Sequence, residues 1–592
     1  MTHPSARELR EADVTIVGAG PVGLSIANLL GLRGVRVNVV EALPDLIDYP
    51  RGVGIDDESL RSIQTMGLIQ DVLPHTTPNH IMRLVNGRGR ILAEIAPAAV
   101  EFGWSRRNAF VQPAVDRALY DGLSRFPHVA VDFDRRAAAI VDHGSHVDVT
   151  VHTGDHEEIT YRSAYLVGAD GGRSLTRKHL GVGFDGQSPS TRWIVIDMEN
   201  DPLGAPNVFV GGDPRRPYVS LALPHALRRF EFMLFDDEPD ELAADDAFIA
   251  RLLAPHLPNP KQVAVLRRRV YTHHSRIAST FRQGRILLAG DAAHLMPVWQ
   301  GQGWNSGMRD STNLAWKLAA VVRGESEDAL LDTYTVERRP HAKAMIDISV
   351  AFGRFIRPTN RLVAALRDSA ASTLALVPSI KSYFVQMKYK PMPRYTRGVV
   401  VDPIDHTPGA ARAELRGKGL LTSFRSFTGV PSPVGTQFIQ PTVRTVEGDE
   451  VRLDDLIGYR WAVLVWGGDP HAHLSPEARE LVRRLDAAVI SLRPVTQLVG
   501  ATSPGTVVAG DVDGRIKRWF DQRPTAALVL RPDRFIAAAG TAQNVGRMLH
   551  AVAAAAHLRP ESPETPAPSA PVRPAVATRT HRRTPVRKAA VK

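Results

Sequence analysis

The sequence predicts a mixed α/β protein with several domains, and three observations carry that prediction. The chain has 592 residues, which is too long for one compact domain, so two to four domains are expected. An apolar run at Val14–Val17, a helical pattern at Leu24–Leu32 and a second apolar run at Val35–Val40 form a β-α-β unit. Far downstream, another apolar strand ends at Gly290-Asp291. Together these segments predict one nucleotide cofactor held by both ends of the same domain.

The turn inside the β-α-β unit has the glycine spacing of a dinucleotide-binding fingerprint. Gly18 permits a tight turn, Gly20 lets the backbone approach a pyrophosphate, and Gly23 allows the helix to pack closely on the strand. The phosphates are expected at the N-terminus of the helix that begins at Pro21, where unpaired amides and the helix dipole favour anions. Glu41 ends the second strand and is placed to accept hydrogen bonds from ribose hydroxyls. A Rossmann-like cofactor domain is therefore predicted.

A second glycine pattern, Gly181-Val-Gly-Phe-Asp-Gly186, has the same letters but the wrong context. It follows the charged, helix-like segment Arg173–Leu180 rather than an apolar strand, and no helical pattern follows it. We interpret it as a turn. The sequence thus predicts one dinucleotide fold and no second fold for a nicotinamide.

The remaining chain divides by composition and hydrophobic pattern. Alternating stretches predict strands at Trp193–Met198, Tyr218–Leu223 and Arg229–Leu234 between the two cofactor segments, and at Trp461–Trp466, Val495–Val499 and Ala526–Leu530 near the end. A glycine-rich loop at Pro297–Gly307 precedes a helical pattern at Met308–Val322. The predicted organisation is a cofactor domain at 8–185 and 275–345, an interleaved sheet-rich domain at 186–274, a helical segment at 346–400, a linker at 401–436, a compact C-terminal domain at 437–557 and a disordered basic tail at 558–592.

Composition and charge exclude several classes of protein. The net charge is +11, but seven basic residues between Arg573 and Lys592 occur without an acidic residue among them, and +4 remains for everything else. The charge therefore belongs to a solvated tail, and a nucleic-acid partner is not predicted. There is no cysteine, so disulfides, thiolate nucleophiles and iron–sulfur clusters are excluded. No metal-binding pattern is predicted.

The compartment is expected to be the cytoplasm, without a membrane partner. Residues Met1–Asp13 are polar and lack the apolar region of a signal peptide. No run approaches the ~18 apolar residues that a membrane span requires.

Three separate strings resemble one family, the single-component (class A) flavoprotein aromatic hydroxylases. They are Gly18-Ala-Gly-Pro-Val-Gly23, Val167-Gly-Ala-Asp-Gly-Gly-Arg-Ser174 and Leu288-Ala-Gly-Asp-Ala-Ala-His294, in the family's order. Longer strings resemble the subgroup that acts on 3-(3-hydroxyphenyl)propanoate: Asp48–Asp57, Phe102–Phe110, Arg216–Ser220, Met296–Gly303 and Lys390–Pro393.

The resemblance implies that the cofactor is FAD and gives each motif a role. The glycine turn with Pro21 faces the pyrophosphate, Glu41 faces the adenosine ribose, and Asp170 supports the pyrophosphate region. Gly290 and Asp291 belong to the motif that binds the ribityl chain. The other implied cofactor residues are Arg51 and Gln112, near the pyrophosphate and ribityl chain, and Gly301, Gln302 and Gly303, whose amides face the pyrimidine edge of the flavin.

The resemblance also implies the reaction. NAD(P)H would reduce FAD, O2 would add to the flavin C4a carbon, and the resulting C4a-hydroperoxide would hydroxylate a phenol ortho to its hydroxyl. The implied substrates are the small aromatic acids 3-(3-hydroxyphenyl)propanoate and 3-hydroxycinnamate, converted to 2,3-dihydroxy products in aromatic-compound catabolism. NADH is favoured over NADPH by the resemblance alone. The C-terminal domain resembles a thioredoxin-like domain that lacks redox cysteines, and its presence is compatible with a homodimer.

Substrate-binding groups are expected between the two cofactor segments. A propanoate group favours a bidentate guanidinium, for which Arg216 and Arg228 are candidates. Candidates for transferring the phenolic proton are Tyr218, His225, Tyr271 and His273. Further positions near the flavin are Pro297, His294 and the acidic pair Asp56 and Asp57, for which the sequence leaves open whether either faces the pocket.

Three alternatives stay open at this point. The same chemistry could act on another phenol, a polyketide or an antibiotic. A flavin dehydrogenase or oxidase is disfavoured by the lack of a second nucleotide fold and by the Gly-Asp motif. A non-catalytic nucleotide-binding or nucleic-acid-binding protein would require three ordered cofactor motifs to be coincidental.

Overall fold

The computed structural model describes residues 8–154, 157–189, 191–401, 432–500 and 502–560. The chain up to Arg559 is one compact unit, and a second unit begins at Pro560. The predicted basic tail spans 558–592, and its residues after Pro560 lie outside the described residues. Residues 402–431 of the predicted linker also lie outside them. No helix in the described ranges is long and apolar enough to cross a membrane.

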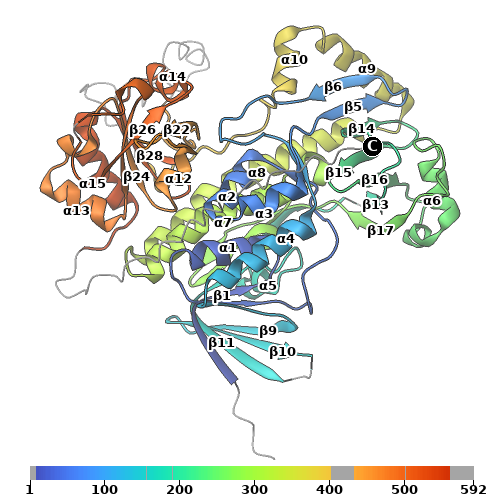
Figure 1. Ribbon diagram of the computed structural model, residues 1–592. Coiled ribbons are helices and arrows are strands. Elements are labelled where there is room, and N and C mark those ends of the chain that lie inside the picture. The colour runs from blue at the N-terminus through green and yellow to red at the C-terminus, as the bar shows by residue number, and fades with distance from the viewer. Residues whose placement is uncertain (1–7, 155–156, 190, 402–431, 501, 561–592) are drawn as a thin grey trace, which may run out of the picture. The chain divides into compact units, whose positions relative to one another are not determined.

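A sheet built around parallel strands organises the N-terminal part of the chain (Figure 1), and the predicted β-α-β unit is confirmed. Its main path runs β19-β20-β11-β1-β2-β8, and the antiparallel strands β10 and β9 extend it from β11. Helix α1 (Pro21–Gly31) connects β1 to β2. The strands are β1 (Glu8–Val17), β2 (Val37–Val40), β8 (Val129–Asp132), β9 (Arg135–Asp142), β10 (Val147–Thr153), β11 (Glu158–Gly168), β19 (Arg282–Gln283) and β20 (Ile286–Leu288).

Three neighbouring strands of this sheet carry the three motifs that the sequence places far apart. Strands β20, β11 and β1 are parallel neighbours, so their carboxyl ends meet at one edge. Backbone bonds continue the pairing into the motifs: the Ala169 amide donates to Val17 O at 2.8 Å and the Ala289 amide to Gly168 O at 3.0 Å. The loops that follow residues 17, 168 and 288 are therefore adjacent.

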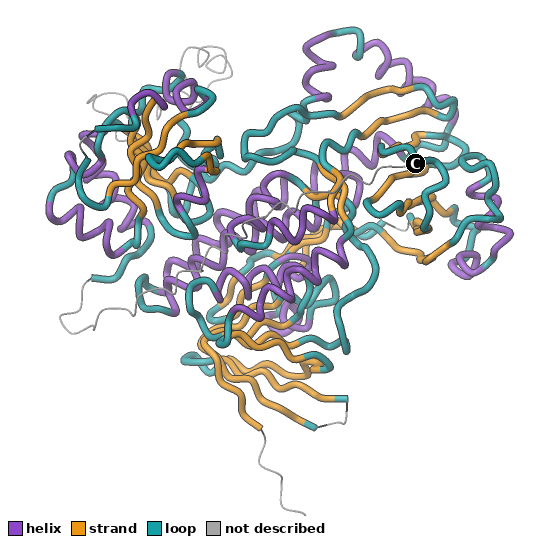
Figure 2. Tube along the Cα trace, in the orientation of Figure 1, coloured by secondary structure: helices purple, strands orange, loops and turns teal. Residues whose placement is uncertain are grey.

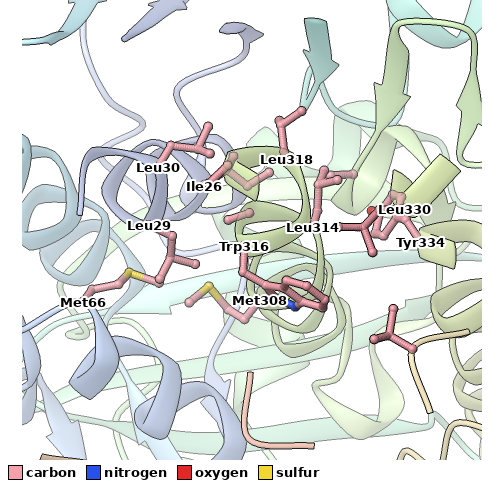
Figure 3. Close-up of a cluster of buried hydrophobic side chains, with 14 of the residues drawn as sticks. Ile26, Leu29, Leu30, Met66, Met308, Leu314, Trp316, Leu318, Leu330 and Tyr334 are labelled. Carbon is pink, nitrogen blue, oxygen red and sulfur yellow. The ribbon is translucent and has the colours of Figure 1, made fainter. Parts of the chain in front are cut away.

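Helices cover this sheet and form the largest apolar core. Helix α7 (Gly303–Val322) packs along α1; Figure 3 shows Ile26, Leu29 and Leu30 of α1 together with Met308 and Leu314 of α7. The long helix α8 (Asp332–Ile356) follows. The other helices of this region are α2 (Asp57–Thr65), α3 (Ile69–Val72), α4 (Gln112–Asp121) and α5 (Leu175–Leu180).

A second, seven-stranded sheet has the order β17-β13-β16-β15-β14-β5-β6. Two of its strands, β5 (Met82–Asn86) and β6 (Ile91–Ile95), come from the segment that the sequence placed in the cofactor domain, because β5 pairs in parallel with β14. Helix α6 (Asp246–Leu253) packs on one face of the sheet. The other strands are β13 (Arg192–Met198), β14 (Val208–Gly212), β15 (Tyr218–Leu223), β16 (Leu227–Leu234) and β17 (Val265–Thr272).

Two small three-stranded sheets and two helices complete this half. The sheets are β3-β7-β4, from β3 (Gly54–Ile55), β4 (Thr76–Thr77) and β7 (Asn108–Phe110), and β12-β18-β21, from β12 (Phe184–Gln187), β18 (Ser275–Ala278) and β21 (His294–Leu295). The second glycine pattern, interpreted as a turn, is one only at its start: Gly181 ends α5 with a φ of +63°, and Phe184–Gly186 belong to strand β12. The helices are α9 (Arg361–Leu374) and α10 (Pro378–Val385).

The C-terminal region is a seven-stranded sheet, β23-β22-β26-β25-β24-β27-β28, with helices beside it (Figure 2). The predicted strand at Val495–Val499 is wrong: the strand is β25 (Ala488–Pro494), and a 3-10 helix follows it. The apolar run ends at Pro494, which has no amide hydrogen to continue a ladder, and Val499 is 98% exposed. The other elements are β22 (Thr442–Arg444), β23 (Glu450–Arg452), β24 (Ala462–Trp466), β26 (Thr506–Asp511), β27 (Ala527–Leu530), β28 (Ile536–Gly540), α12 (Leu453–Ile457), α13 (Pro476–Arg484), α14 (Arg515–Asp521) and α15 (Val545–Ala555).

Buried ion pairs join this region to the cofactor region. Arg531 contacts Glu337 of α8 at 2.8 Å, and Lys317 of α7 contacts the same carboxylate at 2.7 Å. Arg61 of α2 donates to Asp454 at 2.6 Å. Because removing one member of such a pair leaves an uncompensated buried charge, these contacts fix how the two regions meet.

Candidate active site

A cavity of ≈ 500 Å³ lies where the three motif loops meet the second sheet. The cofactor side of its wall includes Gly20, Pro21, Arg51, Gln112 and Asp291, together with Gly290 and residues 301–303. The opposite side is formed by the second sheet. The structure therefore brings the first β-α-β turn and the Gly-Asp motif, some 270 residues apart in sequence, to one cavity of a size usual for a ligand site.

The N-terminus of α1 is open toward this cavity. Gly20 is the residue before the helix, no side chain caps it, and the first turn holds no acidic residue. The first amides of a helix have no partner within it, so this end favours an anion. A Cβ atom built on Gly20 would have no atom within 4 Å, so the space beside it is free for a ligand. These features fit the pyrophosphate of a dinucleotide.

Gly18, Gly23 and Glu41 shape the turn but do not line the cavity. Gly18 has a φ of +108°, and a Cβ there would lie 2.4 Å from the carbonyl of Ala169. A Cβ on Gly23 would lie 2.0 Å from the carbonyl of Gly18. The Glu41 carboxylate accepts from the Ala19 amide at 2.8 Å. The ribose contact of Glu41 stays a prediction.

The Gly-Asp motif is held from below by Asp310, which the sequence did not single out. Its carboxylate accepts from the Gly290 amide at 3.0 Å and contacts His294 Nε2 at 2.7 Å. Arg338 donates to its other oxygen at 2.8 Å. Burial opposes ionisation, but His294 and Arg338 keep the pKa of Asp310 below its ordinary value. His294 therefore supports the Gly-Asp loop through Asp310 rather than lining the cavity. The sequence feature that could have pointed to Asp310 is an acidic residue within the helical pattern Met308–Val322.

Asp291 itself lines the cavity, and its side chain is exposed there. Although the carboxylate is open to the cavity, the protein packed around that cavity raises its pKa by desolvation, while His294 and Arg51 act in the opposite direction. An oxygen-bearing side chain at this position can accept hydrogen bonds from the hydroxyls of a polyol chain.

Gln112 holds the segment that carries Arg51. Its side-chain oxygen accepts from the amides of Arg51 at 3.0 Å and Gly52 at 2.6 Å, and its amide group donates to Asp116 at 3.0 Å. Burial raises the pKa of Asp116 to about 7. Both Arg51 and Gln112 line the cavity, whereas Asp116 acts behind them.

The Asp-Gly motif is braced in a similar way. Asp170 accepts from both the amide and the hydroxyl of Thr176, at 2.9 and 3.0 Å, and its second oxygen is buried without a partner among the described residues. Arg177 donates to Gly172 O at 2.8 Å and to Ala292 O at 2.9 Å, so it ties this motif to the Gly-Asp motif. Arg177 lies within the charged segment Arg173–Leu180, where no local pattern indicates this role, because both of its acceptors are brought near by the fold.

Strands β13, β14 and β15 of the second sheet supply an apolar wall, and β16 and β17 add polar groups beside it: Arg229, Glu231, Arg267, Arg269 and Tyr271. Neighbouring strands contribute Val195, Val208, Val210, Val219 and Leu221 to the cavity. On β16 the cavity-lining residues are Arg229 and Glu231; Glu231 pairs across the strands with Val219, and its carboxylate lies 3.9 Å from the Arg229 guanidinium.

Tyr271 and His273 extend Glu231 into a short chain of hydrogen-bonded side chains. Its hydroxyl donates to Glu231 at 2.7 Å and lies 3.2 Å from His273 Nε2. Burial raises the pKa of Glu231, and burial together with Glu231 raises the pKa of Tyr271 well above its ordinary value. Of the predicted proton-transfer candidates, Tyr271 is the one that lines the cavity.

Three other predicted substrate residues lie elsewhere. Arg216 pairs with Glu238 at 2.6 Å. Tyr218 is on the opposite face of β15 from Val219 and Leu221, where its ring packs 4.3 Å from that of His256. His225 is an exposed turn residue with a φ of +62°.

Arg228, Asp56 and Asp57 are also directed away from the cavity. Arg228 follows the same alternation as Tyr218 and pairs with Asp201 at 2.5 Å. Asp56 pairs with Lys390 at 2.9 Å and with Arg309. Asp57 lies 3.4 Å from Arg106. Pro297 is buried without lining the cavity, although its neighbours Met296 and Val298 do line it.

Comparison with known proteins identifies the two halves of the chain. Residues 11–349 match the family model of the FAD binding domain, and residues 435–555 match that of the HcaD C-terminal domain. A 3-(3-hydroxyphenyl)propionate/3-hydroxycinnamic acid hydroxylase of Mycolicibacterium smegmatis is 52% identical over 92% of this chain and 94% of its own length. One of the same name from Paraburkholderia xenovorans is 48% identical over 93% of this chain and 92% of its own length.

Solved structures show the same fold. The flavin-dependent monooxygenase PieE, in complex with FAD and substrate, superposes with a TM-score of 0.74 over 93% of this chain and all of its own, at 20% identity. Aklavinone-11 hydroxylase with FAD and aklavinone gives a TM-score of 0.70 over 92% of this chain and 99% of its own, at 25% identity.

Proposed function

This chain belongs to the FAD-dependent aromatic monooxygenases, and we propose that it hydroxylates 3-(3-hydroxyphenyl)propanoate and 3-hydroxycinnamate ortho to the phenolic hydroxyl, giving 2,3-dihydroxy products. The observation that carries the proposal is the shared cavity, in which the open end of α1 and the Gly-Asp loop face an apolar wall with one hydrogen-bonded acid. FAD supplies the redox and oxygen-transfer chemistry when bound. NADH as reductant and O2 as oxidant are part of the proposal.

The chain's own residues have three tasks in this reaction. Gly20, Pro21 and Asp291 bind the cofactor and orient it. The valines and leucine of the second sheet exclude water from the reacting ring, which protects a reactive oxygen donor from side reactions. The third task, at Glu231 and Tyr271, is to move a proton.

The Glu231–Tyr271 pair is suited to activate a phenol. The phenolic proton of the substrate passes to the Tyr271 oxygen as the Tyr271 proton passes to Glu231, and the phenolate that results has a more electron-rich ring at the ortho carbon. Because the pKa of Glu231 is raised, it is a stronger base than an ordinary carboxylate. His273, 3.2 Å from the Tyr271 oxygen, extends the hydrogen-bonded chain.

Two finer proposals concern the C-terminal region and assembly. A thioredoxin-like arrangement is supported by the parallel pair β24–β25 beside the antiparallel pair β27–β28. Without cysteine it has no thiol chemistry, so we assign it a structural or assembly role. A homodimer remains a prediction that light scattering of the purified protein tests directly.

The proposed function is tested with the purified, FAD-loaded protein under labelled dioxygen. We expect substrate-dependent NADH oxidation and one labelled oxygen atom in a 2,3-dihydroxy product. Formation of hydrogen peroxide without labelled product would identify an oxidase and contradict hydroxylation. Comparable turnover of simple phenol or of a large polyketide phenol would refute the proposed substrate class.

A further inference from the structure

One of the arginines that line the cavity, Arg107, has no counter-ion among the residues that the structure describes. Arg107 precedes β7 and lines the cavity beside Met82, whose sulfur lies 3.7 Å from its guanidinium. No acidic side chain among the described residues pairs with it, and its Nε atom is buried without a hydrogen-bond partner. Burial lowers the pKa of Arg107. A half-buried guanidinium without a counter-ion among the described residues is costly, so the site favours an anionic ligand.

The other cavity arginines are already engaged or lie near the cofactor loops. Arg229 forms two bonds with Asp197, the shorter at 2.6 Å. Arg267 lies over the Tyr49 ring at 3.8 Å, and Arg269 donates to the Tyr49 hydroxyl at 2.8 Å. Arg51 is held through its backbone by Gln112 on the cofactor side.

The surroundings of Arg107 suit a carboxylate. His80 also lines the cavity, and its amide donates to Arg107 O at 3.0 Å. Burial and Arg107 lower the pKa of His80 to about 3, so this imidazole is neutral at pH 7 and adds no competing charge. Gln300 lines the same cavity, and its side-chain nitrogen is buried without a partner among the described residues. A planar guanidinium can bind both oxygens of a carboxylate.

The sheet sets the distance between this cation and the phenol-activating pair. Glu231 is on β16 and Met82 is on β5, and β15 and β14 lie between them. Three inter-strand spacings correspond to about 14 Å, and Met82 lies two residues along β5 from the position level with Glu231, so the two backbone positions are about 16 Å apart. That span matches an extended phenylpropanoate with a hydrogen bond at each end, and the wall between is apolar.

We propose that Arg107 binds the side-chain carboxylate of the substrate and thereby selects aromatic acids over neutral phenols. This inference rests on the proposed function, because it assumes a phenolic acid in the cavity. With the carboxylate on Arg107, the phenolic hydroxyl reaches the Glu231–Tyr271 pair, and the ring lies against the apolar wall between them.

The test compares two ligands that share the phenol ring and the three-carbon chain, one ending in an anionic carboxylate and the other in a neutral alcohol. Dissociation constants for 3-(3-hydroxyphenyl)propanoate and for the neutral alcohol 3-(3-hydroxyphenyl)propan-1-ol are measured from the change in flavin absorbance. They are measured on FAD-loaded wild type, Arg107→Met and Arg107→Lys. Arg83→Met is the matched control: it removes the same charge one residue from Met82, but Arg83 does not line the cavity and pairs with Glu94 at 2.9 Å. Thermal midpoints and FAD content verify that each variant folds.

We expect Arg107→Met to weaken binding of the acid about 100-fold and to leave binding of the alcohol nearly unchanged. Arg107→Lys should restore part of the loss, and Arg83→Met should match wild type. Equal weakening of both ligands, or no weakening of the acid, would overturn the anchor while leaving the proposed function intact. If wild type binds neither aromatic ligand, both proposals are wrong.

Discussion

The glycine turn offers a test in which fold stability and cofactor binding change in opposite directions. Gly20 has a φ of −75° and a ψ of 177°, which alanine adopts readily, and its Cβ would meet nothing. Gly20→Ala should therefore stabilise the FAD-free protein by about 0.4–1 kcal/mol, because it restricts the unfolded chain. The added methyl group projects into the space beside the α1 amides, so FAD affinity should fall.

The size of the two effects follows from the contacts. Losing one charge-assisted hydrogen bond to a phosphate costs about 1.5–3 kcal/mol, or roughly 10- to 150-fold in FAD affinity. Gly23→Ala is the comparison, since its Cβ would lie 2.0 Å from Gly18 O and 3.3 Å from Ile16. The backbone must move by about 1 Å or more, at a cost of about 1–3 kcal/mol.

The assay measures the thermal midpoint of the FAD-free proteins and the FAD dissociation constant by titration. Gly20→Ala should unfold at or above the wild-type temperature yet bind FAD weakly, whereas Gly23→Ala should unfold earlier and also bind FAD weakly. A Gly20→Ala protein with wild-type FAD affinity would refute the placement of the pyrophosphate. A Gly23→Ala protein of wild-type stability would refute the packing argument.

Three further predictions concern buried ionisable groups. Glu337→Gln should lower the free energy of unfolding at pH 7 by about 3 kcal/mol, because Arg531 outweighs burial and holds the pKa of Glu337 at about 2. Denaturant titrations of the two proteins should show this difference in stability vanishing as the pH falls from about 4.5 toward 2. Asp116→Asn should have the same free energy of unfolding as wild type near pH 4 and a free energy higher by about 4 kcal/mol above pH 7. The reason is that burial raises the pKa of Asp116 to about 7, so ionisation of the folded protein costs stability. Equal unfolding curves of the two proteins at pH 8 would contradict this. Tyr271→Phe should slow hydroxylation about 100-fold and lower the product formed per NADH oxidised, because the substrate phenol then has no hydroxyl through which to pass its proton to Glu231. An unchanged pH–rate profile would exclude Tyr271 from this proton transfer.

The cofactor side of the site could be predicted from sequence because its motifs are local. Each motif is a short loop at the carboxyl end of an apolar strand, so residue type and spacing already specify the turn and the open amides. What the sequence lacked was the order of the strands. Parallel pairing of β1, β11 and β20 places the loops at residues 18, 169 and 290 side by side.

The substrate side was predicted poorly because the face of a strand and the partner of a charge are tertiary properties. Tyr218 and Val219 are consecutive, yet only Val219 lines the cavity, and no local pattern shows which face is covered by α6. Arg106 and Arg107 are consecutive as well. Arg106 contacts Glu101 at 2.7 Å, while Arg107 faces the cavity without a counter-ion among the described residues.

The sequence by itself determined the cofactor class, the β-α-β unit and the family, because glycine turns and strand-end acids are fixed by local backbone requirements. Only the tertiary structure decided which polar groups meet the substrate. Glu231 and Tyr271 come from strands β16 and β17, and Arg107 immediately precedes β7. Their chemistry depends on burial and on pairing across the sheets, which no single stretch of sequence contains.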